Sequence, residues 1–335
     1  MKRIAYFLSV VAIALVYAGC NHDDDLFDGP ALNDLYGEYS RLADLDVSDR
    51  EVDFAAGDLP YFTAAFSKNV DWELTITGNT SGAQKIFTGK SSRLDQTNTR
   101  WNGSTTVFPM FVAEECSVTL IVVNEGDTMT DALTITTSKV DQGFVVADFE
   151  TGMNPAWGGF VQSGANMSFN ITNAGPRAQG NFYYDMGGEV NWDWLIGMIE
   201  FPAQAYGGLQ FPLTDNPNNL WFNVLMYKPP GINNGLVLFQ FREDENADGT
   251  SNDAVEDMYA MELTLEDDGW QLVSVKYSDL VALVDGQPGE PNGNGVHEPH
   301  KLGKISVLML ANPESGYSQA LMDYCISTEG GPLTP

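Results

Sequence analysis

The sequence LWFNVLMY, residues 220–227, is the segment from which the fold is most readily inferred. Its side chains alternate between two sets, which is the period of a β-strand with one buried face. Phe222, Val224 and Met226 form the apolar set and are expected in the core. The other face then carries Trp221, Asn223, Leu225 and Tyr227. The segment therefore predicts a strand that buries one face and displays aromatic and amide groups on the other.

Similar segments continue on both sides of this strand. A β-rich region opens at residues 144–150 with FVVADFE. Its predicted strands occupy residues 181–186, 195–201, 220–227, 236–243, 258–265, 270–277, 305–310 and 320–327. About eight or nine strands without a helical pattern are typical of a jelly-roll sandwich. Residues 144–335 are therefore expected to form one jelly-roll domain.

A second β-rich region precedes it at residues 51–140. Short alternating segments at 52–54, 71–77, 117–123 and 132–137 are separated by turns rich in Gly, Asn, Ser and Asp. This pattern predicts an antiparallel sandwich with the size of one immunoglobulin-like module, with Trp72 in its core. The predicted fold class is thus all-β: an immunoglobulin-like sandwich that acts as a spacer, followed by a jelly roll.

The N-terminus has the features of a secretory signal. Two basic residues precede an apolar run at residues 4–16, which is short for a membrane span. Small residues then precede Cys20, an arrangement that resembles the lipobox of bacterial lipoproteins, although Tyr17 takes the place of the usual leucine. The resemblance implies that residues 1–19 are a signal peptide and that Cys20 is acylated.

The segment after Cys20 is acidic and sparsely apolar. Asp23-Asp24-Asp25 resembles the export signal of Bacteroidetes-type lipoproteins that are sent to the outer face of the cell. Residues 20–50 are expected to form a tether. These resemblances imply a protein that is anchored by lipid in the outer membrane and faces the cell exterior.

Charge and cysteine content exclude several classes of protein. The chain has 46 acidic and 16 basic residues, for a net charge of −30, which disfavours binding to nucleic acid or to anionic lipid headgroups. Cleavage of the signal would remove Lys2 and Arg3 and no acid, which would change the charge from −30 to −32. Cys116 and Cys325 are expected as buried apolar residues without a disulfide.

The strands that follow residues 220–227 suggest a ligand site. Gln240 and Arg242 alternate with an apolar set in residues 236–243, and Glu262 does so in residues 258–265. If the three strands are neighbours, one face combines rings with planar polar groups, which suits the C–H face and hydroxyls of a sugar. The predicted glycan-binding residues are Trp221, Asn223, Tyr227, Gln240, Arg242 and Glu262. The alternative is an ordinary solvated face.

A second aromatic group lies in loop segments. It consists of Trp157, Trp192 and Trp194, in surroundings rich in Gly, Asp and Asn. Loop tryptophans at the rim of a sandwich form an alternative sugar site, but they also close the ends of such sandwiches. Both interpretations remain open from the sequence.

One acidic loop has the beginning of a calcium-binding pattern. Asp244, Asn246 and Asp248 alternate and are followed by glycine. The EF-hand spacing would require glutamate where Val255 stands, so the loop is not an EF-hand. A looser calcium loop and a solvated acidic hairpin are the two alternatives.

Three segments carry a resemblance to a known family. They are Asp148-Phe149-Glu150, the segment GWQLVSV at 269–275, and LMDYCI at 321–326. Their order resembles the galactose-binding-domain-like carbohydrate-binding modules of glycan-utilisation systems in gut Bacteroidetes. The resemblance implies a structural calcium near Glu150 and Asp323, glycan as ligand and an outer-membrane glycan transporter as partner.

The sequence thus predicts a surface glycan-binding protein without catalytic residues. The first alternative is a glycoside hydrolase or lyase of the same fold, with Glu262 and Asp193 as its acids. The second alternative is an adhesin or assembly subunit whose exposed aromatic residues contact protein. No nucleophile elbow, phosphate-binding loop or redox cysteine pair is present in the sequence.

Overall fold

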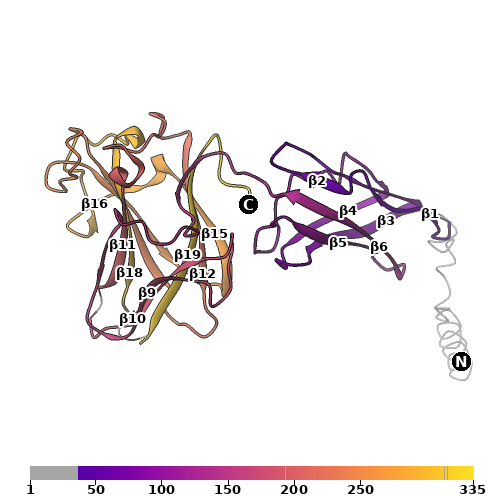
Figure 1. The fold of residues 1–335 in the computed structure, drawn as a ribbon, viewed down its shortest axis with the longest axis horizontal. Coiled ribbons are helices and arrows are strands. Elements are labelled where there is room, and N and C mark those ends of the chain that lie inside the picture. Colours follow the sequence, from indigo (N-terminus) through magenta and orange to yellow (C-terminus); the bar gives the residue numbers. More distant parts are fainter. Residues whose placement is uncertain (1–36, 193, 313, 315) are drawn as a thin grey trace, which may run out of the picture.

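The computed structural model describes residues 37–192, 194–312, 314 and 316–335. Figure 1 shows two β-rich domains that follow one another along the long axis. The prediction of an all-β chain is therefore confirmed. Cys20 and the Asp23-Asp24-Asp25 segment lie outside the described residues. Over the described part of the chain we find no helix with the length and hydropathy of a membrane span.

The first domain contains six strands within the described residues. They are β1 (Arg41–Val47), β2 (Glu51–Asp53), β3 (Phe62–Gly78), β4 (Gln84–Leu94), β5 (Glu114–Val122) and β6 (Asp127–Thr137). Their order is β1-β3-β5-β6-β2, and β4 pairs with β3. Strand β1 lies within residues 20–50, which the sequence predicts as tether. That boundary is corrected, because Leu45 and Val47 of β1 are buried in the domain core.

Alternation along β3 explains how this core forms. Trp72, Leu74 and Ile76 are buried at successive alternate positions, as a strand with one apolar face requires. The Trp72 ring lies so close to the β4 backbone that a Cβ at Gly89 would be 2.4 Å from Trp72 Cζ2. The indole nitrogen Nε1 donates to Ser91 Oγ at 2.9 Å. The prediction of Trp72 as a core residue is confirmed.

The second domain is a sandwich of two sheets. The first, named here the β19 sheet, has the order β15-β12-β19-β10-β9 with β7 paired to β19; the second, the β18 sheet, has the order β17-β16-β14-β13-β18-β11-β8. The bounds are β7 (Phe144–Ala147), β8 (Gly158–Val161), β9 (Ala165–Thr172), β10 (Tyr183–Glu189), β11 (Leu195–Pro202), β12 (Leu220–Lys228), β13 (Leu236–Glu243), β14 (Met258–Thr264), β15 (Gly269–Lys276), β16 (Val281–Val284), β17 (Gln287–Pro288), β18 (Leu302–Leu310) and β19 (Ser318–Glu329). Three short 3-10 helices are η1 (Ala203–Tyr206), η2 (Tyr277–Asp279) and η3 (Pro299–Lys301).

The core of the sandwich lies between the two sheets. Phe222 of β12 contacts Phe239 and Phe241 of β13, with ring centroids 5.6 and 5.0 Å apart. The apolar set predicted for residues 220–227 is buried, since Phe222, Val224 and Met226 are each exposed by 2% or less. All eight strands predicted in this domain are present, whereas β8, β9, β16 and β17 were not predicted.

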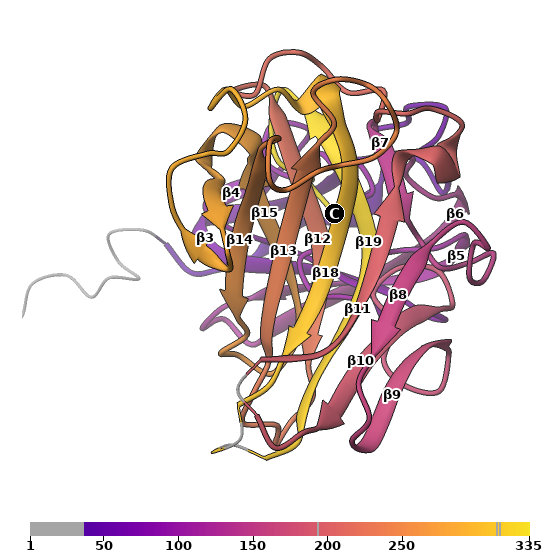
Figure 2. The same cartoon turned by 90° about the vertical axis from the view of Figure 1, so that its left-hand side faces the viewer.

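The two domains contact each other through the β19 sheet. Phe108 and Met110 of the first domain pack against Leu225, Tyr324 and Leu333 of the second. The Met110 N–H donates to the carbonyl of Ala178 at 2.7 Å, and the Thr105 N–H donates to that of Pro335 at 2.7 Å. Figure 2 shows the β18 sheet from its outer side, with the first domain behind it. The outer face of the β18 sheet therefore points away from the first domain.

The prediction for the two cysteines of the domains is confirmed. Cys116 and Cys325 are both free and both fully buried. Burial raises the pKa of the Cys116 thiol to about 12 and that of Cys325 well above its usual value. Both therefore act as small core residues.

Candidate functional site

The sequence predicts one ligand face over three neighbouring strands, and this arrangement is wrong. Strand β12 lies in the β19 sheet, whereas β13 and β14 lie in the β18 sheet. The physical reason is that the connection at residues 229–235 crosses from one sheet to the other instead of forming a hairpin. The six predicted residues are divided between the two outer faces: Trp221, Asn223 and Tyr227 on one, and Gln240, Arg242 and Glu262 on the other.

Asn223 is a buried structural residue. It has no exposed surface, and its Nδ2 donates to the Ile326 carbonyl at 3.1 Å and to Thr328 Oγ1 at 2.9 Å. Its Oδ1 accepts from Ser274 Oγ at 2.7 Å and from the Leu333 N–H at 2.9 Å. The amide thus joins β12, β15, β19 and the segment after β19, and it has no free group to offer a ligand.

Trp221 and Tyr227 are half-buried on the same face. Lys276 Nζ lies 5.3 Å from the centroid of the Trp221 ring, and the Tyr227 ring lies 5.2 Å from that of Trp270. Leu225, between them along β12, is fully buried against the first domain. This face therefore serves mainly as the contact between the domains.

The outer face of the β18 sheet carries a row of linked polar side chains. Arg242 donates from Nη1 to Ser306 Oγ at 2.8 Å and from Nη2 to Gln240 Oε1 at 2.7 Å, and its Nε donates to Asp253 at 2.9 Å. The row continues on β18 and β11: Ser306 Oγ donates to Glu200 Oε1 at 3.1 Å, and Lys304 Nζ lies 3.2 Å from the same oxygen. The register explains this row, because Gln240 and Glu200 both lie opposite Ser306. We call these residues the polar row.

An apolar strip runs beside the polar row on this face. Its buried members are Leu195, Leu238, Ala260, Leu283, Leu308 and Leu310. Phe160 of β8 lies opposite Met198 of β11 and is 46% exposed. The outer face of the β18 sheet therefore brings aliphatic and aromatic side chains next to amide, guanidinium and carboxylate groups, and most of the aliphatic side chains are covered.

A groove of about 640 Å³ opens at the β14 side of this strip. Leu236, Leu238 and Leu310 line it together with Glu262. The turn between β16 and β17 supplies Gly286, and β17 supplies Gln287. Trp194 also lines the groove, and its side chain is 45% exposed. A Cβ at Gly286 would lie 3.8 Å from Trp194 Cη2, so the indole faces that turn. The groove thus combines one residue of each predicted site, Glu262 and Trp194.

The other two loop tryptophans have different environments. The Trp157 ring packs edge-on against Phe201 and Phe149 at centroid distances of 5.0 and 5.9 Å, and its Nε1 donates to Tyr206 Oη at 3.2 Å. Trp157 is therefore partly buried and packs against the core, and its assignment to a loop site is corrected. Trp192 is 39% exposed and donates to the Leu195 carbonyl at 3.2 Å. Asp193, the second acid of the enzymatic alternative, lies outside the described residues.

The acidic loop predicted to bind calcium folds upon itself. Asp244 accepts from the N–H groups of Asp248 and Gly249, at 3.1 and 2.8 Å. Asn246 Oδ1 accepts from the Asp248 N–H at 2.8 Å, and Asp248 Oδ1 accepts from the Thr250 N–H at 2.8 Å. These side chains thus satisfy backbone groups of their own loop, as Asx turns do. Among the described residues, the acids that converge are instead Glu243, Glu245 and Asp257.

Glu150 and Asp323 hold one loop between them. Glu150 Oε1 accepts from the N–H groups of Asn181 and Phe182 at 2.7 and 2.8 Å, and Asp323 Oδ2 accepts from those of Ala178 and Gln179 at 3.1 and 2.9 Å. Burial raises the pKa of Asp323 to about 8 in spite of these donors. Both carboxylates therefore face N–H groups in this structure, which is the role of a loop anchor.

The fold and the groove define a two-domain all-β protein with a groove on the outer face of its distal sheet. No protein-family model and no curated protein matches the chain. Among solved structures, it is similar to a family 11 carbohydrate-binding module from Clostridium thermocellum in complex with a β-1,3-1,4-mixed-linked tetrasaccharide. The identity is 16% and the TM-score 0.39, over 57% of this chain and 98% of the module.

Two further solved structures are similar at the same level. SGBP-B from a complex xyloglucan utilization locus in Bacteroides uniformis has 12% identity and a TM-score of 0.34, over 86% of this chain and 74% of that one. The CBM22-1 xylan-binding domain of Paenibacillus barcinonensis Xyn10C has 12% identity and a TM-score of 0.32, over 57% of this chain and 97% of that one. Because these values are low, the function of this chain is inferred from its own residues.

Proposed function

We propose that the chain is a glycan-binding protein whose site is the groove on the outer face of the β18 sheet. The observation that carries the proposal is Trp194, an indole that is 45% exposed at the edge of a groove of about 640 Å³. A concave apolar surface with an aromatic side chain and a few polar groups on its walls is the usual form of a ligand site. A pyranose fits this surface, because its C–H face packs on an aromatic ring while its hydroxyls require polar partners.

The polar partners are available at two places. Glu262 and Gln287 are exposed on the walls of the groove itself. The polar row extends the same face toward β8, and Arg242, whose side chain is 14% exposed, is held there by three side chains. Sugar rings of one extended glycan would thus contact the groove first and the polar row next. The mechanism is capture without chemical change.

The charge of the chain favours a neutral glycan. A net charge of −30 repels polyanions such as uronic acid polymers over about one Debye length, roughly 8 Å at physiological ionic strength. The groove itself carries Glu262 and Asp279. A neutral glycan meets neither barrier, and its hydroxyls can donate hydrogen bonds to both carboxylates.

The place of action that we propose is the outer face of the outer membrane. Support comes from the lipobox-like segment at Cys20 and from the acidic segment Asp23-Asp24-Asp25. A second support is the orientation of the groove, since the β18 sheet faces away from the first domain, and β1 lies at the far end of that domain (Figure 1). The acyl anchor would hold the protein, the first domain would act as spacer, and a glycan transporter would be the partner.

A glycan array with the soluble chain, followed by affinity gel electrophoresis, tests the proposal. If a sugar covers one face of Trp194, it buries about half of the roughly 110 Å² that this side chain exposes. Burial of that area contributes about 1.4 kcal/mol to the binding free energy, or about tenfold in Kd. Trp194→Ala is therefore expected to weaken binding about tenfold. Trp221→Ala, on the opposite sheet, is the matched control and is expected to keep the affinity. Retention of no glycan at all, or equal effects of the two substitutions, would contradict the proposal.

Hydrolysis is the competing function, and one observation favours it. Glu262 and Asp279 are two exposed carboxylates on the same groove, and paired carboxylates cleave glycosidic bonds. We expect no new reducing ends after incubation of the protein with the glycan that it retains. If reducing ends appear and Glu262→Gln abolishes them, the protein is an enzyme and the capture mechanism is wrong.

A further inference from the structure

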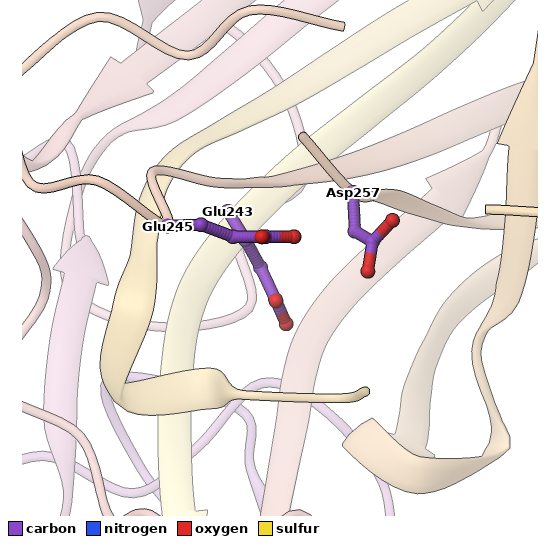
Figure 3. Close-up of side chains that lie close together, drawn as sticks. All are labelled: Glu243, Glu245 and Asp257. Carbon is purple, nitrogen blue, oxygen red and sulfur yellow. The ribbon is translucent and has the colours of Figure 1, made fainter. Parts of the chain in front are cut away.

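We propose that Glu243, Glu245 and Asp257 form a binding site for a divalent cation, with calcium as the fitting ion. The three residues lie at the base of the β13–β14 hairpin: Glu243 ends β13, Glu245 follows it by two positions, and Asp257 immediately precedes β14. One carboxylate oxygen of each lies within 4.8 Å of the other two. Figure 3 shows Glu243 and Glu245 extending from one segment toward the space beside Asp257.

Backbone pairing holds two of the three acids in this arrangement. The Glu243 N–H donates to the carbonyl of Asp257 at 3.0 Å, so the two acids remain opposite each other at the end of the ladder. Glu245 lies two positions beyond Glu243, in the turn that directly follows β13. Two of the three acids are therefore fixed where the β13–β14 ladder ends, and the third lies at the start of the acidic loop.

An independent observation points to an ion at this place. Glu243 is fully buried, and its Oε1 accepts from Tyr277 Oη at 2.9 Å and from the Glu298 N–H at 2.7 Å. The other oxygen, Oε2, is buried without any hydrogen-bond partner. A buried carboxylate oxygen that has lost its water and gained no donor is strongly unfavourable. A cation coordinated by Oε2 supplies the missing partner.

The surroundings leave the negative charge of the cluster uncompensated. Among the described residues, no lysine or arginine forms an ion pair with any of the three acids, and the nearby Lys301 Nζ pairs with Glu298 at 2.7 Å. The partners of Asp257 are neutral: the N–H groups of Gly293 and Gly295 donate to its two oxygens at 2.6 and 2.7 Å. Three carboxylates at this spacing need a cation to be ionised together.

A glycine-rich loop covers the cluster closely. A Cβ at Gly293 would lie 2.0 Å from Glu245 Oε1 and 2.9 Å from Asp257 Cγ, so a side chain there would displace these carboxylates. The Asn294 N–H also donates to Glu245 Oε1 at 3.2 Å. The loop begins after β17, so the cation would tie the hairpin base to the loop that follows one wall of the groove.

The donor set selects calcium. All three ligands are carboxylates, which are hard oxygen donors, whereas zinc sites in proteins are usually built with histidine or cysteine. Calcium accepts irregular coordination by six to eight oxygens and completes it with carbonyl groups and water, whereas magnesium demands a near-ideal octahedron. The proposal does not depend on glycan binding.

The test uses the purified chain, freed of metal with EGTA. At a calcium concentration about 100-fold above Kd, the melting temperature of the second domain should rise by roughly 5–10 °C. Glu245→Gln and Asp257→Asn should lose this rise, while Asp248→Asn, the matched control in the adjacent acidic loop, should keep it. Glu243→Gln should melt no lower than the wild type in EGTA, because it removes a buried charge.

A spectroscopic measurement makes the result independent of stability. Tyr277 donates to Glu243, and Tyr259 Oη donates to Asp257 Oδ2 at 3.3 Å, so tyrosine lies next to the site. Terbium bound there should luminesce on excitation of tyrosine, and calcium should quench this emission by displacement. Identical melting curves in calcium and EGTA, together with no sensitised emission, would overturn the proposal. Loss of the calcium effect in Asp248→Asn alone would also overturn it.

Discussion

Replacement of Asn223 by alanine should destabilise the second domain without any effect on ligand binding. Its amide makes four close hydrogen bonds, two as donor and two as acceptor, at distances from 2.7 to 3.1 Å. The substitution leaves the Ile326 carbonyl and the Leu333 N–H without partners in a place that water does not reach, since these residues are exposed by 0% and 5%. Alternation alone would place Asn223 on an accessible face, where it could bind a ligand. The result therefore distinguishes a ligand-binding role of Asn223 from a structural one.

The magnitude follows from the kind of partner that is lost. Two of the four bonds involve hydroxyl groups and cost less to lose. The Ser274 hydroxyl can rotate to another acceptor, and Thr328 Oγ1 still donates to the Gly331 carbonyl at 2.7 Å. The two backbone groups have no such freedom, and each buried unsatisfied group costs about 1–3 kcal/mol. With about 1 kcal/mol for the remaining bonds, we expect a loss of roughly 3–7 kcal/mol in the free energy of unfolding.

Urea titration followed by tryptophan fluorescence and circular dichroism measures this loss. Asn218→Ala is the matched control, because Asn218 is exposed just before β12, and it should stay within about 0.5 kcal/mol of the wild type. The affinity of Asn223→Ala for a glycan should equal that of the wild type under conditions in which it is folded. A loss below about 1 kcal/mol, or weaker glycan binding by a fully stable variant, would refute the reasoning.

Four other predictions follow from the core, the buried acid and the N-terminus. Phe239→Ala should lower the free energy of unfolding by about 3–5 kcal/mol, because it leaves a cavity in the core. A urea midpoint near that of the wild type would contradict the placement of Phe239 in the core. Asp323 has a pKa of about 8 when folded, above its unfolded value, so its stabilising effect is complete at low pH and disappears as the pH rises toward 8. In urea titrations, Asp323→Asn should therefore reduce the loss in the free energy of unfolding between pH 5 and pH 9. An unchanged dependence of this free energy on pH would count against the prediction. Cys20→Ala should release the protein from membranes, and a variant that still sediments after a carbonate wash would exclude the lipid anchor. Neutralising Asp23-Asp24-Asp25 should protect the protein from external protease, whereas unchanged cleavage would argue against a surface signal.

The sequence predicts what depends on neighbouring residues along one strand. Phe222, Val224 and Phe239 are buried as alternation requires, because side chains of a strand point to opposite faces whatever sheet it joins. The sheet that a strand joins cannot be predicted in this way, because it depends on the path of the connection between two strands. Residues 229–235 carry the chain across the sandwich, and for this reason Trp221 and Gln240 lie on opposite sides of the molecule.

The surroundings of loop residues are also set by residues that are distant in the sequence. Trp157 and Trp194 have similar sequence surroundings, but Trp157 meets Phe201, which is more than forty residues away, and Trp194 meets the β16–β17 turn. The acidic cluster of Glu243, Glu245 and Asp257 could not be predicted from the sequence for the same reason. Glu243 and Glu245 alternate visibly in the sequence, but Asp257 joins them only through strand pairing. The signal that was available is that both ends of one hairpin are acidic.

The fixed guanidinium of Arg242 has a consequence for the rate of ligand exchange. Because Asp253, Ser306 and Gln240 already hold its donors, little side-chain freedom remains to be lost when a ligand arrives. Encounter should therefore proceed in one kinetic phase, without a slow rearrangement, and glycans of different affinity should differ mainly in how quickly they leave. Short residence of each sugar segment would let a long polymer move along the face of the sheet while it remains attached.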